Sequence, residues 1–272
     1  LNHPGRAKWW RKCLGSGGEA DLSELPNPLR WLGLIVLLCS LLWQTPARTV
    51  GLLLPASVEL EGFTGSLWQG QAARSRLLFG DKAFQLGSLS WSLSPRSLLS
   101  LAPSFDLNTR WGAQRLDLAV RFTLSGLEVR HLKGDLDVRF VRQLAPLYVG
   151  GQMHVDLQAL DFHPGQVPEI VGKVLWRRAV WTARGGDVGL GNFQMTWSNP
   201  DRAGQPGEAI GEIVTLSGAL NAAGEVAIAS DNYRVNVTLT GPALNNEALR
   251  GALQMLASPD GEGLRIQLSG EL

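Results

Sequence analysis

The sequence predicts a mainly β protein: one N-terminal membrane helix, then an antiparallel β domain forming a curved sheet or sandwich, with one amphipathic helix near the C-terminus. Beyond residue 48, apolar and polar residues alternate with a period of two, the spacing at which side chains return to the same face of a strand. Gly, Pro, Asn and Asp, which favour turns, are frequent between the alternating runs. Residues 31–47 contain no charge, which predicts the membrane helix.

The uncharged run fixes the predicted topology. A helix rises about 1.5 Å per residue and a bilayer core is roughly 30 Å thick, so about 17 apolar residues are near the minimum for one crossing. Trp31 and Trp43 bracket the run, as expected of indoles that lie at the two headgroup layers. Basic residues are concentrated before it, which places the N-terminus in the cytoplasm. We therefore expect a flexible cytoplasmic tail at 1–28, an anchor at 29–48 and an exported domain at 49–272.

Two other interpretations of the same run stay open. The sequence Thr45-Pro46-Ala47 could end a cleaved secretory signal, although the basic segment before it is longer than signal peptides usually carry. The run could also be a buried core helix.

Charge and cysteine content exclude several classes. Lys and Arg total 25 against 24 Asp and Glu, with no long run of one sign, so the sequence lacks the basic surface of a nucleic-acid-binding protein. Cys13 and Cys39 are the only cysteines, so the domain at 49–272 must fold without disulfides.

The elements follow from the pattern in chain order. Alternating runs predict strands at 116–124, 132–140, 153–159, 174–180, 233–239 and 264–268. A short apolar run at 97–101, after Pro95, is compatible with one helical turn. Apolar residues at steps of three and four after Pro242 predict an amphipathic helix at 243–257. This helix would cover an end or edge of the sheet, or bind a partner.

Two segments of the chain resemble each other. Each offers a glycine, a strand centred on a tryptophan, a turn, a Leu-Gly pair and a second strand that ends on a tryptophan. The first contains Gly65, Leu67, Trp68, Gly70, Leu86, Gly87 and Trp91, and the second contains Gly172, Trp176, Leu190, Gly191 and Trp197. We expect two related β-modules, at about 58–140 and 150–272, that form one continuous sheet or two packed sheets. The four tryptophans are expected to anchor a core or groove.

The search for reactive groups predicts no catalytic, cofactor-binding or metal-binding residue. His154 and Asp156 share a strand face, but no further ligand-type residue joins them, which favours a solvated surface. Asp135 and Asp137 share a face on which Arg139 continues the row, as on an ordinary charged sheet. Nucleophile, phosphate-loop and dinucleotide motifs are absent from the sequence.

Taken together, these motifs resemble the N component of bacterial type II secretion systems. The resemblance is carried by 65–70, by Leu86-Gly87 with Trp91 and Pro95, by 172–179 with Leu190-Gly191, and by the closing segment 258–272. It runs from about residue 60 to the C-terminus. It implies a non-catalytic accessory protein with no cofactor, held in the bacterial inner membrane by a single pass, with its bulk in the periplasm. The implied partners are the secretin, the inner-membrane platform proteins and the lipid bilayer.

Two functions of other classes remain as alternatives. A periplasmic β-groove that binds or transfers lipid would show an apolar trough along the domain instead of a closed core. An envelope enzyme acting on glycan or peptide would need convergent titratable groups, which the sequence does not supply.

Overall fold

A computed structural model describes residues 27–54, 56–79, 82–138, 148–183, 186–198 and 207–271. The chain divides into two compact units, Leu1–Thr45 and Pro46–Leu272. The predicted tail at 1–28 lies outside the described residues except for Asn27 and Pro28, which begin the first helix.

The first unit contains helix α1, Asn27–Trp43, of 17 residues. The apolar side chains that are described between Trp31 and Trp43 are exposed, and those two tryptophans are about two-thirds exposed. Among the described residues, no helix combines the length and the apolar character needed to cross a membrane. The predicted anchor at 29–48 also extends beyond this helix, because Pro46 bridges to Ser66 and Ala47 is 2% exposed within the β unit.

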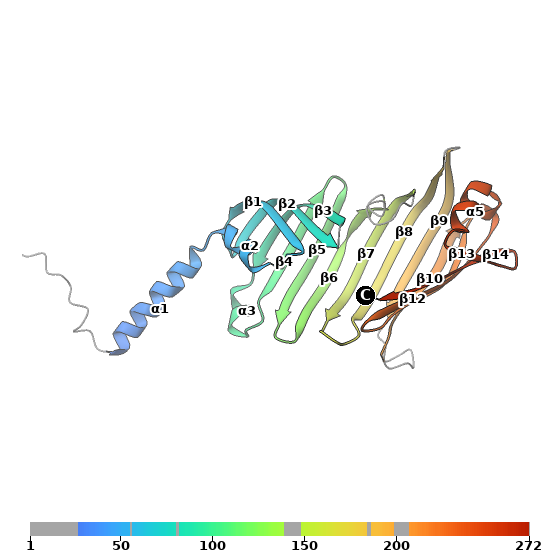
Figure 1. Cartoon of the computed structure of the whole chain (residues 1–272). Helices are drawn as coiled ribbons and strands as arrows, with labels where there is room; N and C mark the ends of the chain where they lie inside the picture. Colours follow the sequence, from blue (N-terminus) through green and yellow to red (C-terminus); the bar gives the residue numbers. More distant parts are fainter. Residues whose placement is uncertain are drawn as a thin grey trace, which may run out of the picture. The chain divides into compact units, whose positions relative to one another are not determined.

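The second unit is one continuous antiparallel sheet of 14 strands, in the order β1-β2-β3-β4-β5-β6-β7-β8-β9-β10-β11-β12-β14-β13 (Figure 1). Its first strands are β1 (Val58–Gly65), β2 (Gln69–Phe79), β3 (Lys82–Leu93), β4 (Ser104–Trp111), β5 (Gln114–Thr123), β6 (Gly126–Asp137) and β7 (Val149–Phe162). The others are β8 (Glu169–Ala183), β9 (Gly186–Ser198), β10 (Ala209–Gly218), β11 (Asn221–Ile228), β12 (Asn232–Thr240), β13 (Ala257–Asp260) and β14 (Gly263–Glu271). Both predicted modules therefore belong to a single sheet.

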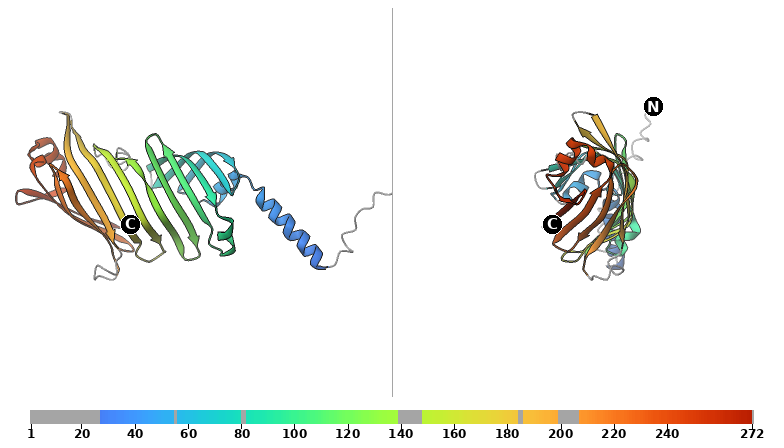
Figure 2. Two further views of the ribbon diagram at one scale, coloured as in Figure 1. Left: turned by 180° about the vertical axis from the view of Figure 1, so that it is seen from behind. Right: turned by 90° about the vertical axis from the view of Figure 1, so that its right-hand side faces the viewer.

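The two faces of the sheet differ in polarity because of the alternation seen in the sequence. Partners in an antiparallel ladder share a face, so cross-strand pairs such as Leu107↔Leu118, Val120↔Val129 and Val155↔Val174 extend one apolar face from strand to strand. The sheet is bent so that one face is concave (Figure 2). The helical segments that pack against the apolar side chains lie inside the bend, so the apolar face is the concave one.

Three clusters of buried side chains lie along the apolar face. One is formed by β8, β9, β11, β12 and β14 with the C-terminal helical segments, and it includes Phe193, Leu239 and Leu264. A second lies over β7, β8 and the start of β10. The third joins Ala47, Ala72 and Trp91 at the β1 end. A single layer therefore buries its apolar residues by curvature and by short helical covers.

Those covers are short. At one end, η2 (Ala47–Thr49) and α2 (Val50–Leu53) lie against β1. At the other, η5 (Pro242–Asn245) and α5 (Glu247–Leu253) bury Leu244 and Leu249. A further turn, α3 (Pro95–Leu99), matches the predicted helical turn near 97–101.

The prediction of one helix over 243–257 was wrong in its extent. Asn246 adopts an extended conformation and its side chain accepts a hydrogen bond from the Leu249 amide, so it ends η5 and caps α5. Ala257 already pairs with Ile266 in β13. The segment covers one end of the apolar face, as one of the two interpretations predicted.

Candidate interaction surfaces

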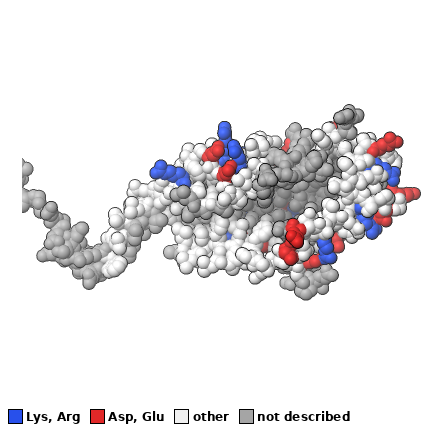
Figure 3. Space-filling view, viewed as in Figure 1, with Lys and Arg blue, Asp and Glu red and all other residues white. Residues whose placement is uncertain are grey.

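The apolar concave face is the largest candidate surface. Figure 3 looks onto it: Lys, Arg, Asp and Glu lie over the β1–β2 hairpin and over β12–β14 with α5, whereas the described surface between them is largely uncharged. Phe122 and Leu268 on this face are 43% and 41% exposed. No second sheet covers it within the described part of the chain.

The opposite face carries polar side chains that pair across strands. Lys133 Nζ lies 3.5 Å from Asp156 Oδ1, and His154 Nδ1 lies 2.9 Å from Asp135 Oδ1. Asp137 shares this face of β6, whereas Arg139 lies outside the described residues. The predicted His154 and Asp156 row is thus an ordinary charged ladder. No group of three or more His, Cys, Asp or Glu residues that could hold a metal occurs in the described ranges.

Two carboxylates on the polar face have well-defined partners. Arg130 Nη2 donates to Asp161 Oδ2 at 2.8 Å, with a second bond from Nη1 to Oδ1, and this pairing raises the pKa of Arg130 although burial works to lower it. Burial works to raise the pKa of Asp117, but hydrogen bonds from Arg115 and Asn108 outweigh it and leave that pKa below its usual value. The Arg130–Asp161 pair joins β6 to β7, and the Asn108–Asp117 hydrogen bond joins β4 to β5.

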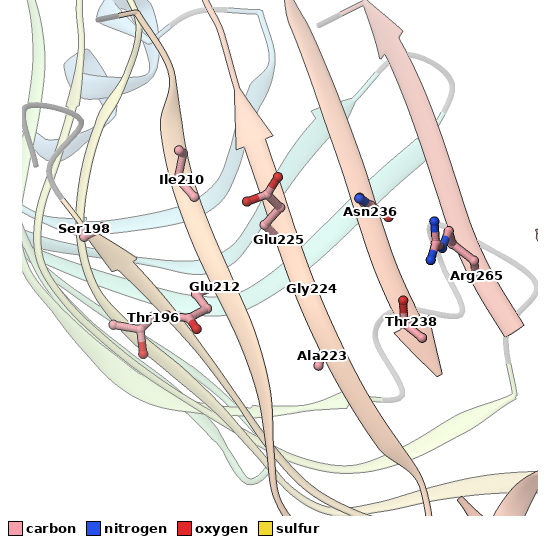
Figure 4. Close-up of a pocket in the computed structure, with 10 residues that line it drawn as sticks. All are labelled: Thr196, Ser198, Ile210, Glu212, Ala223, Gly224, Glu225, Asn236, Thr238 and Arg265. Carbon is pink, nitrogen blue, oxygen red and sulfur yellow. The ribbon is translucent and has the colours of Figure 1, made fainter. Parts of the chain in front are cut away.

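An open groove of about 590 Å³ lies on the polar face over β9–β14 (Figure 4). Glu212 and Glu225 are direct cross-strand partners in it, and Asn236 and Thr238 on β12 line the same groove. Arg265, also in the lining, is paired with Asp260 at 2.6 Å. The groove is shallow and polar, and none of its side chains is arranged as a nucleophile with its base.

The tryptophans singled out by the sequence lie in different environments. Trp91 near the end of β3 is 5% exposed, and its Nε1 donates to the Leu67 carbonyl at 3.1 Å. Trp176 in β8 is half-buried and donates to the Gly150 carbonyl at 3.1 Å. Trp197, also half-buried, covers Gly211 on β10.

The first repeat copy departs from its predicted form at Trp68. This residue lies in the turn between β1 and β2 instead of in the middle of a strand, because the chain reverses between Gly65 and Gly70, which face each other across the hairpin. The half-buried Leu67 lies in the same turn, and Pro95 takes the first position of α3.

The two copies nevertheless share one backbone irregularity. Ser75 pairs with Gly87, and Ala179 pairs with Gly191, each between two register shifts of its hairpin. The small residues are 2% and 1% exposed, and the glycines have φ of 81° and 135°. A Cβ at Gly191 would lie 2.1 Å from the Ser217 carbonyl oxygen. The Leu-Gly pairs, with Leu86 half-buried and Leu190 buried, therefore mark equivalent bulges.

Aligned on these bulges, the tryptophans are not equivalent. Trp176 pairs with Phe193 as Ala72 pairs with Leu89, so Trp176 corresponds to Ala72 and not to Trp68. Gly172, with φ of 145°, pairs with Trp197 in the second hairpin. The repeat is therefore carried by backbone geometry more than by aromatic residues.

The two edges of the sheet form the last candidate surface. At one end β1 offers eight residues, and no described strand lies beyond it. At the other, β13 has four residues and contains Pro259, which has no amide hydrogen. β14 extends beyond β13 at 267–271. Nothing in the sequence pattern singled out these edges, nor Ser75 or Arg130.

The chain is similar in sequence to proteins of one family. The family model for type II secretion system (T2SS), protein N matches residues 56–267. Type II secretion system protein N of Vibrio cholerae serotype O1 is 26% identical over 243 residues, covering 84% of this chain and 91% of that protein. The protein of the same name from Aeromonas hydrophila is 27% identical over 255 residues, covering 85% and 92%. No solved structure matches. Because the family model extends from just before β1 into β14, the chain belongs to the type II secretion system protein N family.

Proposed function

We propose that the chain is a non-catalytic accessory and scaffold component of the type II secretion system. Its N-terminal segment attaches it to the bacterial inner membrane with the N-terminus in the cytoplasm, and the β unit works in the periplasm. There it contacts the secretin and the inner-membrane platform proteins during protein export. Membership in the family supports a role in the type II secretion system. The membrane attachment, the periplasmic location and the partners are further parts of the proposal.

The observation that carries the scaffold role is the open, single-layer sheet. Within the described residues, one face of 14 strands is apolar and only short helical segments cover its ends. The charged face carries paired side chains without a catalytic arrangement. Such a molecule offers surfaces and edges to other proteins.

Support for attachment to the membrane comes from the first unit. The residues of α1 are uncharged from Trp31 to Trp43, and the apolar side chains described there, such as Leu32, Val36 and Leu41, are exposed. Exposed apolar side chains in such a segment are stabilised by lipid, and the basic residues that precede it favour a cytoplasmic N-terminus.

A lipid-binding function is the second candidate, and the concave apolar face favours it. Apolar side chains with few polar neighbours could contact acyl chains, as they do in other hydrophobic sites. This function would use the concave face and leave the charged face without a partner.

Photo-crosslinking in intact cells separates the two candidates. A photoreactive residue at Asp135, 68% exposed on the charged face, is compared with one at Phe122, 43% exposed on the concave face. Trapping of secretin or platform proteins supports the scaffold function. Trapping of lipid alone, at Phe122 alone, supports the alternative and contradicts the scaffold.

A further inference from the structure

Along the outer edge of β1, backbone hydrogen-bonding groups have no strand partner among the described residues. The Leu78 amide donates to the Ser57 carbonyl, which shows which residues of β1 form hydrogen bonds with β2. In an antiparallel pair, alternate residues direct their amide and carbonyl groups toward and away from the partner strand. Those of Val58 and Leu60 therefore point away from β2, where no described strand follows.

The side chains of β1 define what could bind there. Val58 and Leu60 lie on the apolar face, whereas Glu59 and Glu61 lie on the charged face. Glu59 Oε2 lies 3.7 Å from Arg76 Nη1. Glu61, more than half exposed, is 3.8 Å from Arg74. Because the cations that the structure describes beside both carboxylates lie on β2, the open side would favour basic side chains.

A second copy of the chain is a poor occupant. If β1 paired antiparallel with β1 of a second copy, Glu59 and Glu61 of the two copies would lie opposite or diagonal to one another. They would occupy the non-hydrogen-bonded residue pairs, in which side chains of neighbouring strands approach most closely. The far edge of the sheet is a poor occupant too, since β13 is short and contains Pro259. These features favour a strand of another protein.

We propose that β1 accepts one extended strand from a partner protein, with apolar residues on the concave side and Lys or Arg opposite Glu59 and Glu61. Main-chain hydrogen bonds to Val58 and Leu60 hold the strand, and the alternating side chains select it. This inference rests on the proposed scaffold function and names its contact. Because β13 blocks part of the other edge, addition occurs at one end and gives a defined complex instead of a fibre.

The purified full-length chain and blocked synthetic peptides test this directly. One probe alternates valine and lysine over eight residues, a second replaces lysine with glutamate, and a third carries N-methyl groups on alternate backbone nitrogens of the first. Binding is measured by fluorescence polarisation, and amide hydrogen exchange locates it. Two cross-strand pairs predict a preference for the lysine peptide of about fivefold or more. The methylated peptide should not bind.

Variants of the chain make the test specific. Glu59→Gln with Glu61→Gln should remove the preference between the peptides and retain the main-chain contribution. Val58→Pro removes an outward amide without removing a β1–β2 bond, and it should abolish binding. Glu212→Gln with Glu225→Gln makes the same change on the same face away from the edge and should have no effect.

Three results would overturn the proposal. They are equal affinity for the lysine and glutamate peptides, protection of amides at 267–271 instead of at Val58 and Leu60, and concentration-dependent dimerisation that Val58→Pro removes. Because this experiment uses no secretion component, its failure leaves the crosslinking test of the proposed function unaffected.

Discussion

Replacement of Trp91 by alanine is the sharpest test of how the β1 end of the sheet is stabilised. Trp91 is 5% exposed among Ala47 and Ala72, and its ring meets that of Phe63 edge to face at 6.3 Å between centroids. Loss of a buried Trp side chain costs about 3–5 kcal/mol, and the Leu67 carbonyl also loses its donor, worth about 1 kcal/mol. We expect the free energy of unfolding to fall by about 4–6 kcal/mol.

The assay is urea unfolding of the full-length chain in detergent, followed by far-ultraviolet circular dichroism. With a denaturant dependence of about 2–3 kcal/mol per M, the Trp91→Ala midpoint should fall by about 1.3–3 M. Trp91→Phe retains most of the ring and should cost about 1–2 kcal/mol. Trp111→Ala, at a side chain 39% exposed, serves as the control and should cost less than about 1 kcal/mol.

The outcome that refutes this reasoning is a Trp91→Ala variant within about 1 kcal/mol of Trp111→Ala. That result would mean that η2, α2 and the aromatic residues around Trp91 contribute little to the stability of this end of the sheet.

Three further predictions concern the backbone and the charged face. Gly191→Ala should destabilise the chain by about 2 kcal/mol or more, because the residue has a positive φ and its new Cβ would clash with the Ser217 carbonyl. In the same urea assay Gly189→Ala, where the space around the Cβ is open, should change stability by less than about 0.5 kcal/mol. Because the folded pKa of Asp117 is lowered, its carboxylate adds stability above the unfolded value near 3.8 and loses it as pH falls through the folded value. Asp117→Asn should therefore lower the urea midpoint slightly at neutral pH and have no effect in strong acid; equal effects at both pH values would contradict this. Asp161→Asn should cost about 1–3 kcal/mol, against less than about 0.5 kcal/mol for Asp135→Asn, and equal losses in urea unfolding would contradict the special role of the Arg pair.

Much of the sheet could be predicted from the sequence because alternation is a direct consequence of strand geometry. The runs at 116–124, 153–159 and 233–239 lie within β5, β7 and β12 or extend one residue beyond them. The equivalent Leu-Gly positions of Gly87 and Gly191 were also visible, since only glycine fits the bulges.

Other features depend on contacts that a linear pattern does not contain. The apolar spacing at 243–257 is that of a helix throughout. However, Asn246 caps α5 and so divides the segment into two short helices, and Ala257 pairs with Ile266 in the edge strand β13. The residues around Trp68 look like those of a strand, but Trp68 lies in a hairpin turn. The position of this turn is set by the pairing of Gly65 with Gly70 across β1 and β2. The assembly of both predicted modules into one sheet depends on β6–β7 pairing, which no local motif specifies.

The strand order has a consequence for how the chain assembles. From β1 to β12 every strand bonds to the next in the sequence, and only β13 and β14 exchange places. Pairing between sequence neighbours closes short loops and carries a small entropic penalty, so it favours fast folding even in an all-β protein. The polypeptide can thus add one hairpin at a time as it emerges from the ribosome or a translocation channel, without waiting for its C-terminus.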